Sequence, residues 1–189
     1  MKLTNIIANI LKENNSETLR FWHGGNLDDY SENIAQKKGR YKYGPGLYLI
    51  SKYDLAKKYA KGGRKLYLID VEVGNDIEDS FLDIDIANQF IRENVILRLR
   101  KEVTERLTKY VKNGKIRASI FENIILNSES ITSTKTNNLR QFYIDNNIDY
   151  QIVDNAFGSG GRMMVLYNMG KIKNVKQVKY KDEIDVFDL

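Results

Sequence analysis

An amphipathic repeat in the middle of the chain constrains the fold more than any other feature of the sequence. Apolar residues recur four positions apart from Ile91 to Leu107, and most of the positions between them are charged. This spacing puts the apolar side chains on one face of a helix, so it predicts helical structure over roughly 83–113. Strand-like stretches lie before and after the helices, an order that predicts an α+β domain with a mostly antiparallel sheet.

The other elements are predicted from local patterns. Helical spacing predicts helices at 3–13, 51–63, 116–126 and 136–147, and Ser51 and Gly62 mark the ends of the second. Strands are predicted at 18–25, 43–50, 65–74, 149–154, 163–169 and 175–180. A chain of 189 residues can bury one core. We therefore expect a single domain over 1–189, with an N-terminal helix in 1–16 and a helical insertion at 83–147.

Composition narrows the chemistry. The chain has no cysteine and a single histidine, which excludes thiol catalysis, disulfides and metal sites built from thiolates or several histidines. No apolar run approaches the roughly 20 residues that a membrane helix needs. We therefore expect a monomeric, metal-free protein of the cytoplasm, with no membrane partner.

The net charge of +5 favours an anionic partner such as nucleic acid or an acidic protein. A lysine-rich surface that serves solubility is the alternative. One basic group lies in the predicted central helix, where a solvated helix face explains it better than a nucleic-acid footprint. This group consists of Arg98, Arg100, Lys101 and Arg106.

The single histidine, His23, stands at the end of a predicted strand and is followed by Gly24 and Gly25. Glycine lets a ligand approach main-chain N–H and C=O groups closely. The pattern therefore suits a flat, polar ligand such as an amide. Taken alone, the motif is better explained by a half-buried histidine beside a simple glycine turn.

Two tyrosines form the second motif, "YGPGLYLISKYDLAKKYA". Tyr48 lies on a predicted strand and Tyr59 lies eleven positions later, on the next helix. Two rings brought to one cleft would make a slot for a flat cationic ring such as the nicotinamide of NAD⁺. Core filling is the alternative in a chain with 12 tyrosines.

Taken together, "HGG", "GPGLYLI" and "AKKYA" resemble the ADP-ribosyltransferase superfamily. The similarity is to its histidine–tyrosine–glutamate class, which diphtheria-type toxins and poly(ADP-ribose) polymerases share. It directly covers roughly 20–75 and implies split antiparallel β-sheets flanked by helices, with NAD as co-substrate and no metal. By the same resemblance, a small phage or bacterial effector of this class would act in the cytoplasm of a bacterium or an infected host cell.

The resemblance assigns roles to individual residues. His23 would bind the adenosine ribose, and Gly24, next to Gly25, would bind the nicotinamide carboxamide through its backbone. Tyr48 and Tyr59 would stack on the nicotinamide. Ala56 stands where the polymerase branch has a serine that also binds the carboxamide. The loss of one neutral hydrogen bond costs about 1 kcal/mol, so weaker NAD binding is expected.

The glutamate of this class has no obvious counterpart. Cleavage of the bond between nicotinamide and ribose passes through an oxocarbenium-like state that a carboxylate stabilises. Alignment on Tyr167 puts Met163 at the glutamate position. Asp154, before the turn into this strand, could supply a carboxylate or could simply cap the turn. Arg162 could contact a pyrophosphate or lie free on the surface.

Three functions stay open at this point. The resemblance implies a mono-ADP-ribosyltransferase that acts on a macromolecular acceptor, either protein or nucleic acid, such as a host factor. A catalytically inactive NAD-fold module that binds or inhibits a partner is the second. The third is a relative of RNA 2′-phosphotransferases, which the lack of arginines around "WHGGNLDDYSEN" disfavours.

Overall fold

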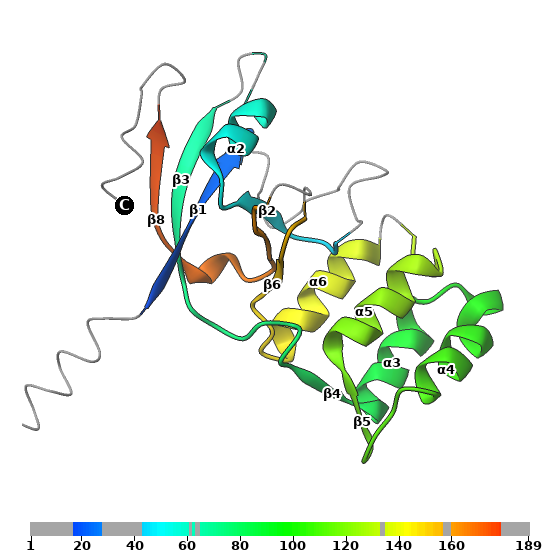
Figure 1. Cartoon of the computed structure of the whole chain (residues 1–189). Coiled ribbons are helices and arrows are strands. Elements are labelled where there is room, and N and C mark those ends of the chain that lie inside the picture. Colours follow the sequence, from blue (N-terminus) through cyan, green and yellow to red (C-terminus); the bar gives the residue numbers. More distant parts are fainter. Residues whose placement is uncertain are drawn as a thin grey trace, which may run out of the picture.

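A computed structural model of the chain contains a six-stranded antiparallel sheet (Figure 1). Three of its strands precede the helical region in the sequence and three follow it. The first three strands are β1 (Thr18–Gly24), β2 (Leu47–Ile50) and β3 (Leu66–Glu72). The last three are β6 (Tyr150–Val153), β7 (Met163–Leu166) and β8 (Ile172–Val178). Their order is β6-β7-β2-β1-β3-β8. The structure describes residues 17–27, 43–60, 62, 65–132, 135–156 and 160–178.

The sheet consists of two halves that meet at a narrow join. Strand β1 pairs with β3 along its whole length, from Thr18 to Gly24, and β2 pairs with β7 over four residues. Between β1 and β2, in contrast, the register holds a single pair, Trp22 with Ile50. The prediction of an α+β domain with an antiparallel sheet and flanking helices is confirmed, and the two halves belong to one sheet.

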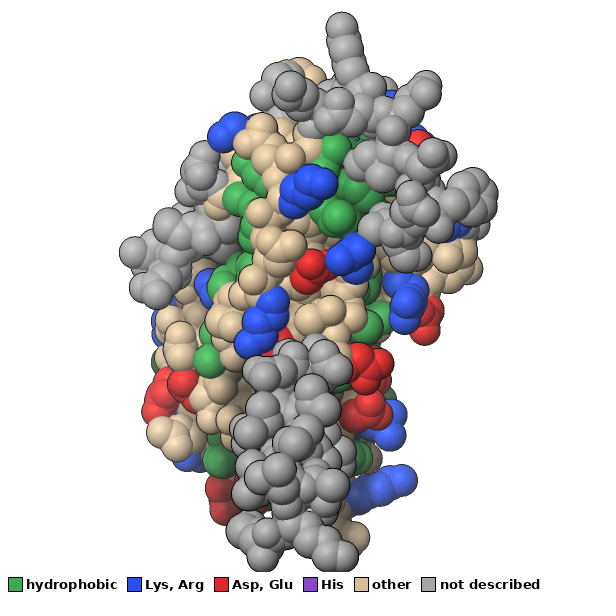
Figure 2. All heavy atoms as spheres, turned by 90° about the vertical axis from the view of Figure 1, so that its left-hand side faces the viewer, with side chains coloured by type: hydrophobic (Ala, Val, Ile, Leu, Met, Phe, Trp, Pro, Cys, Tyr) green, Lys and Arg blue, Asp and Glu red, His purple; other side chains and the backbone are tan. Residues whose placement is uncertain are grey.

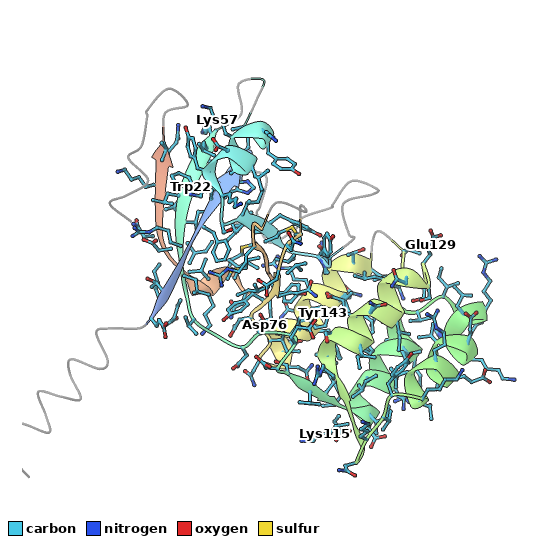
Figure 3. All side chains as sticks on the ribbon, in the orientation of Figure 1. Trp22, Lys57, Asp76, Lys115, Glu129 and Tyr143 are labelled. Carbon is cyan, nitrogen blue, oxygen red and sulfur yellow. The ribbon has the colours of Figure 1, made fainter. Side chains whose placement is uncertain are left out.

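The alternation of side chains along the strands defines two sheet faces. On one face lies an apolar cluster that includes Phe21, Leu49 and Ile69. On the other, Trp22 and Ile50 pack beneath helix α2 (Tyr53–Tyr59), and Trp22 is labelled in Figure 3. Further along this second face, Met163, Val165 and Tyr167 join the core of the helical region. Helix α2 and the helical region therefore cover different parts of the same face.

The helical region follows β3 and precedes β6 in the sequence. It contains α3 (Ile84–Asn94), α4 (Arg100–Thr108), α5 (Ala118–Asn127) and α6 (Thr136–Asp145). A short 3-10 turn, η2 (Leu97–Leu99), precedes α4, and another, η4 (Met169–Lys171), precedes β8. Strands β4 (Phe81–Asp83) and β5 (Lys115–Arg117) form a small separate ladder that the sequence patterns did not predict.

The predicted central helix is interrupted at Val95. This residue has extended backbone angles, and the next amide, Ile96 N–H, donates to the carbonyl of Ser130. The Arg100 side chain donates to the Val95 carbonyl, which the break leaves without a helical partner. Val95, Val103 and Leu107 are nevertheless buried together in one core. The apolar period therefore continues across the break in the sequence, because α3 and α4 both bury their apolar faces in the same core.

Two other expectations need comment. Ser51 does not cap α2, because Lys52 occupies the N-cap position and the Ser51 hydroxyl instead accepts from the Arg162 amide. The predicted helices at 3–13 and 1–16 lie outside the described residues. In the part of the chain that the structure describes, no helix combines the length and apolar character required to span a bilayer.

Candidate functional site

The imidazole of His23 bridges the point where β1 and β2 part. Its Nδ1 lies 3.0 Å from the carbonyl oxygen of Tyr48. A carbonyl oxygen only accepts, so Nδ1 carries the proton, and in the neutral ring Nε2 is then an acceptor. One residue beyond the Trp22–Ile50 pair, this side-chain contact joins the two strands in place of further backbone pairing.

His23 is held in its neutral form. Only 4 % of the residue is exposed. Burial lowers the pKa of His23 below its ordinary value, and the bond to the Tyr48 carbonyl opposes this shift. The ring of Tyr67 stacks beside it, with centroids 6.4 Å apart. The imidazole is therefore an oriented hydrogen-bonding group rather than a surface charge.

The two glycines after His23 each allow a close approach. A Cβ atom at Gly25 would lie 2.8 Å from the His23 Nε2, so only glycine lets the chain pass over the imidazole. A Cβ atom at Gly24 would overlap the carbonyl oxygen of Ala56. Helix α2 therefore rests directly on β1, and Ala56 is fully buried there. Gly24, which was predicted to bind the carboxamide, therefore packs against Ala56, the residue at the position of the family's serine.

The two predicted stacking tyrosines have different surroundings. Tyr48 packs against the core of the helical region, and its hydroxyl donates to the Gly44 carbonyl at 2.8 Å. Tyr59, the last residue of α2, is 49 % exposed. Both stand on the sheet face that α2 covers, but no ring contact joins these two described residues. Their predicted stacking on nicotinamide stays a prediction.

The predicted carboxylate lies away from His23. Asp154 is exposed, in the turn that follows β6. Three strand spacings separate β6 from β1 in the sheet order, which amounts to about 14 Å. Arg162 is also exposed, and its backbone pairs with Ser51. Met163, at the glutamate position, is buried in the core beside Ile50.

A buried carboxyl that the sequence analysis missed lies in the helical region. Glu122, on α5, is 3 % exposed and accepts a hydrogen bond from the Tyr167 hydroxyl at 2.9 Å. Burial raises its pKa to about 7, and the Tyr167 hydrogen bond opposes the rise. The sequence did carry a signal: Glu122 interrupts the apolar stretch "SIFENIIL".

Aromatic and glycine residues enclose the Glu122 carboxyl. The ring of Tyr143, where α6 meets the strands (Figure 3), lies 4.8 Å from the ring of Tyr167. Burial, and then the nearby Glu122 charge, raises the pKa values of both tyrosines well above normal. Gly44 has φ +89°, and a Cβ atom there would overlap Oε1 of Glu122. The glycine turn before β2 therefore rests on this carboxyl, and through Gly44 it connects Glu122 to Tyr48.

Basic and acidic side chains are interspersed on the face of the molecule that carries β8. Figure 2 views the side on which β8 lies and shows lysine and arginine side chains interspersed with acidic ones. Arg20 pairs with Asp70 at 2.7 Å, and Lys173 pairs with Glu72 at 3.1 Å. Among the described residues on this face, the basic side chains therefore form no continuous surface (Figure 2). Within the described ranges, no three histidine or acidic side chains gather as a metal site.

Comparisons of the chain with protein-family models, with curated proteins and with solved structures gave no match. A function for the chain must therefore be argued from the geometry and chemistry of its own side chains. Two places carry that chemistry. One is the join between β1 and β2 around His23, and the other is the region around Glu122.

Proposed function

We propose that the chain is an NAD-dependent mono-ADP-ribosyltransferase that acts on a protein or nucleic-acid acceptor. The observation that supports this most is the bond from His23 Nδ1 to the Tyr48 carbonyl, at the point where β1 and β2 part. This bond fixes the ring orientation and leaves Nε2 in the acceptor state, as a neutral histidine requires for binding a ribose hydroxyl.

The meeting of three separate segments supports the same proposal. Gly24 on β1, Tyr48 on β2 and Ala56 on α2 lie on one face of the sheet, and each occupies a position that the family resemblance assigns to nicotinamide binding. Gly24 and Ala56 are in direct contact. A local sequence match that occurred by chance would not require these segments to converge.

In the proposed reaction, the bond between the nicotinamide nitrogen and ribose C1′ breaks, and nicotinamide leaves with the electron pair. A nucleophile of the acceptor attacks C1′ and loses its proton. A carboxylate near the ribose would stabilise the positive charge that develops on it. Asp154 is the carboxylate proposed from the sequence. Glu122 is the alternative, because it lies against the turn that carries Tyr48.

The test is transfer of ADP-ribose from NAD⁺ labelled in its adenylate half, given separate protein and nucleic-acid fractions as acceptors, with nicotinamide release measured in parallel. We expect His23→Ala and Tyr59→Ala to lower transfer at least tenfold. Phe81→Ala is the matched control for Tyr59→Ala, because Phe81 is an exposed aromatic residue on β4. Equal transfer by His23→Ala and the wild type would reject the proposal.

An inactive NAD-binding module is the second candidate, and the position of Met163 favours it. A buried methionine occupies the place of the expected glutamate. This candidate predicts heat of NAD⁺ binding in calorimetry without release of nicotinamide. Asp154→Asn and Glu122→Gln would then leave both measurements unchanged, whereas an enzyme would lose turnover in one of them.

A further inference from the structure

A cleft of about 640 Å³ is lined by α5, by the end of α4 and by Gln151 on β6. This volume is within the range of small-molecule sites. Its lining combines two cations, two carboxyl groups including Glu78, two tyrosine rings and several amide groups that donate or accept hydrogen bonds. These residues include Arg106, Lys109, Tyr110, Glu122, Asn123 and Gln151.

The cleft contains a polar group that lacks a partner. The side-chain oxygen Oε1 of Gln151 is buried and has no hydrogen-bond partner among the described residues. Such an acceptor is unfavourable when buried, so a donor supplied by a ligand would stabilise it. Glu122 lines the same cleft. With its pKa raised to about 7, this carboxyl both donates and accepts near neutral pH.

The rim of the cleft has a different character. Arg106 and Lys109 are three positions apart, at the end of α4, and so project from the same side. Arg106 forms a 4.0 Å ion pair with Glu102, and 41 % and 62 % of the two side chains are exposed. Tyr110, next to Lys109, is 53 % exposed. The rim therefore presents two cations and an accessible aromatic ring.

We propose that this cleft binds a nucleotide. The edge of the base meets Gln151 and Glu122, its face stacks on Tyr110, and the phosphate pairs with Arg106 and Lys109. A planar ring with a donor and acceptor edge, joined to an anion, matches all three parts of the lining. An acidic peptide would use the cations, and its backbone N–H groups could donate to Gln151 Oε1, but its carboxylate side chains offer no planar ring to stack on Tyr110.

The nucleotide site goes beyond the proposed function, because it lies apart from the β1–β2 join and shares with that function only Glu122, the alternative carboxylate. Gln151 and Tyr48 both pair with Val165, on opposite sides of β7. Two strand spacings, about 10 Å, therefore separate them along the sheet. The nucleotide is either free or part of a nucleic acid, and the two sources share the chemistry that the cleft recognises.

The test is calorimetric titration of the full chain carrying His23→Ala, a variant chosen to weaken the proposed NAD binding at the β1–β2 join. Ligands are the four 5′-ribonucleoside monophosphates, NAD⁺, a six-nucleotide single-stranded DNA, inorganic phosphate and a glutamate hexapeptide. We expect at least one monophosphate or the DNA to bind at least tenfold tighter than phosphate. Tighter binding of the DNA would identify nucleic acid as the source.

Variants of the residues that line the cleft test whether the nucleotide binds there. The double variant Arg106→Ala/Lys109→Ala should weaken it at least tenfold, and Gln151→Leu should alter the preference among bases. Arg98→Ala/Lys101→Ala is the matched control, with equal loss of charge in η2 and α4 outside the cleft lining, and should retain affinity. Circular dichroism checks that each variant is folded.

Three results would overturn the proposal: no binding of any nucleotide by folded protein, binding that survives the cleft variants, or equal affinity for phosphate or the peptide. None of them depends on ADP-ribose transfer, which is measured separately with the native His23.

Discussion

His23 in the sheet and Glu122 in the helical region are both buried in a way that favours the neutral form, and their hydrogen bonds differ. His23 bonds to a backbone carbonyl of a neighbouring strand, whereas Glu122 bonds to a tyrosine hydroxyl contributed by the sheet. Burial is the largest cause of both pKa shifts. Burial therefore favours the neutral form of both groups. His23 becomes charged when it gains a proton at low pH, and Glu122 becomes charged when it loses its proton at high pH.

The two groups also differ in how local their environment is. Gly25, which passes over the imidazole of His23, is only two positions away from it, so the motif "HGG" is visible in the sequence although Tyr48 and Tyr67 come from other strands. The surroundings of Glu122 come from Gly44 and Tyr167, on distant parts of the chain. A site built from neighbouring residues is visible in the sequence, while one built from distant residues is not.

The variant with the largest expected effect is Gly24→Ala, which tests whether the contact between β1 and α2 stabilises the part of the sheet that contains β1. Gly24→Ala puts a methyl group into the Ala56 carbonyl, which is backbone and cannot move aside easily. We expect a loss of about 3 kcal/mol or more in the free energy of unfolding, measured by urea denaturation.

Gly114→Ala is the control for Gly24→Ala. Gly114 has φ +73° and open space around it, so only backbone strain applies there, at about 1 kcal/mol. Equal losses in the two variants would show that helix α2 does not rest on Gly24 as tightly as described.

The variant Glu122→Gln tests whether the buried carboxyl of the helical region is neutral. In the wild type, the folded carboxyl binds its proton up to about pH 7, while the unfolded carboxyl releases it at about 4.5. The free energy of unfolding therefore falls as pH rises from 4.5 to 7, by about 3 kcal/mol at most. The glutamine cannot ionise, so the variant should gain this amount at pH 8 and nothing at pH 4.5.

Urea denaturation across this pH range measures the gain. The exposed carboxyl of Glu105 offers a control, and Glu105→Gln should leave the pH dependence unchanged. A Glu122→Gln curve parallel to that of the wild type would contradict a neutral buried carboxyl.

The pH dependence of His23 should have the opposite sign. Its pKa is lowered in the folded state from a model-peptide value of 6.5, so stability is complete above pH 6.5 and is lost as pH falls below it. Because Glu122 acts in the other direction, the comparison is best made in the Glu122→Gln background. There, His23→Gln should flatten the decline in unfolding free energy between pH 6.5 and 5, and an unchanged decline would assign it to other groups.

The smallest expected effect concerns the connection between the two regions. Tyr48→Phe removes only the hydroxyl that bonds the Gly44 carbonyl, so we expect a loss of about 1 kcal/mol in unfolding free energy. Tyr110→Phe, at an exposed ring, should cost almost nothing. A Tyr48→Phe loss as small as that of Tyr110→Phe would mean that the glycine turn keeps its shape without this bond.

Much of the secondary structure followed from local patterns. Strands β1, β2, β3, β6 and β7 and helices α2 and α6 lie within the predicted stretches, and α5 extends one residue beyond its predicted end at 126. The break at Val95 did not follow, because the apolar period continues across it and the amide of Ile96 finds its partner at Ser130. Strands β4 and β5, of three residues each, are too short to leave an alternating pattern.

The sequence by itself determined which residues are apolar and at what period, and therefore which faces of the helices and strands are buried. It also determined where the glycines stand, and glycine is the residue that close approach requires. Only the tertiary structure decided that the two sheet halves meet at one residue pair, that His23 bridges them and that Glu122 is buried beneath the glycine turn. The physical reason is that pairing and burial depend on residues distant in the chain, and their free energies appear only when the whole fold brings those residues together.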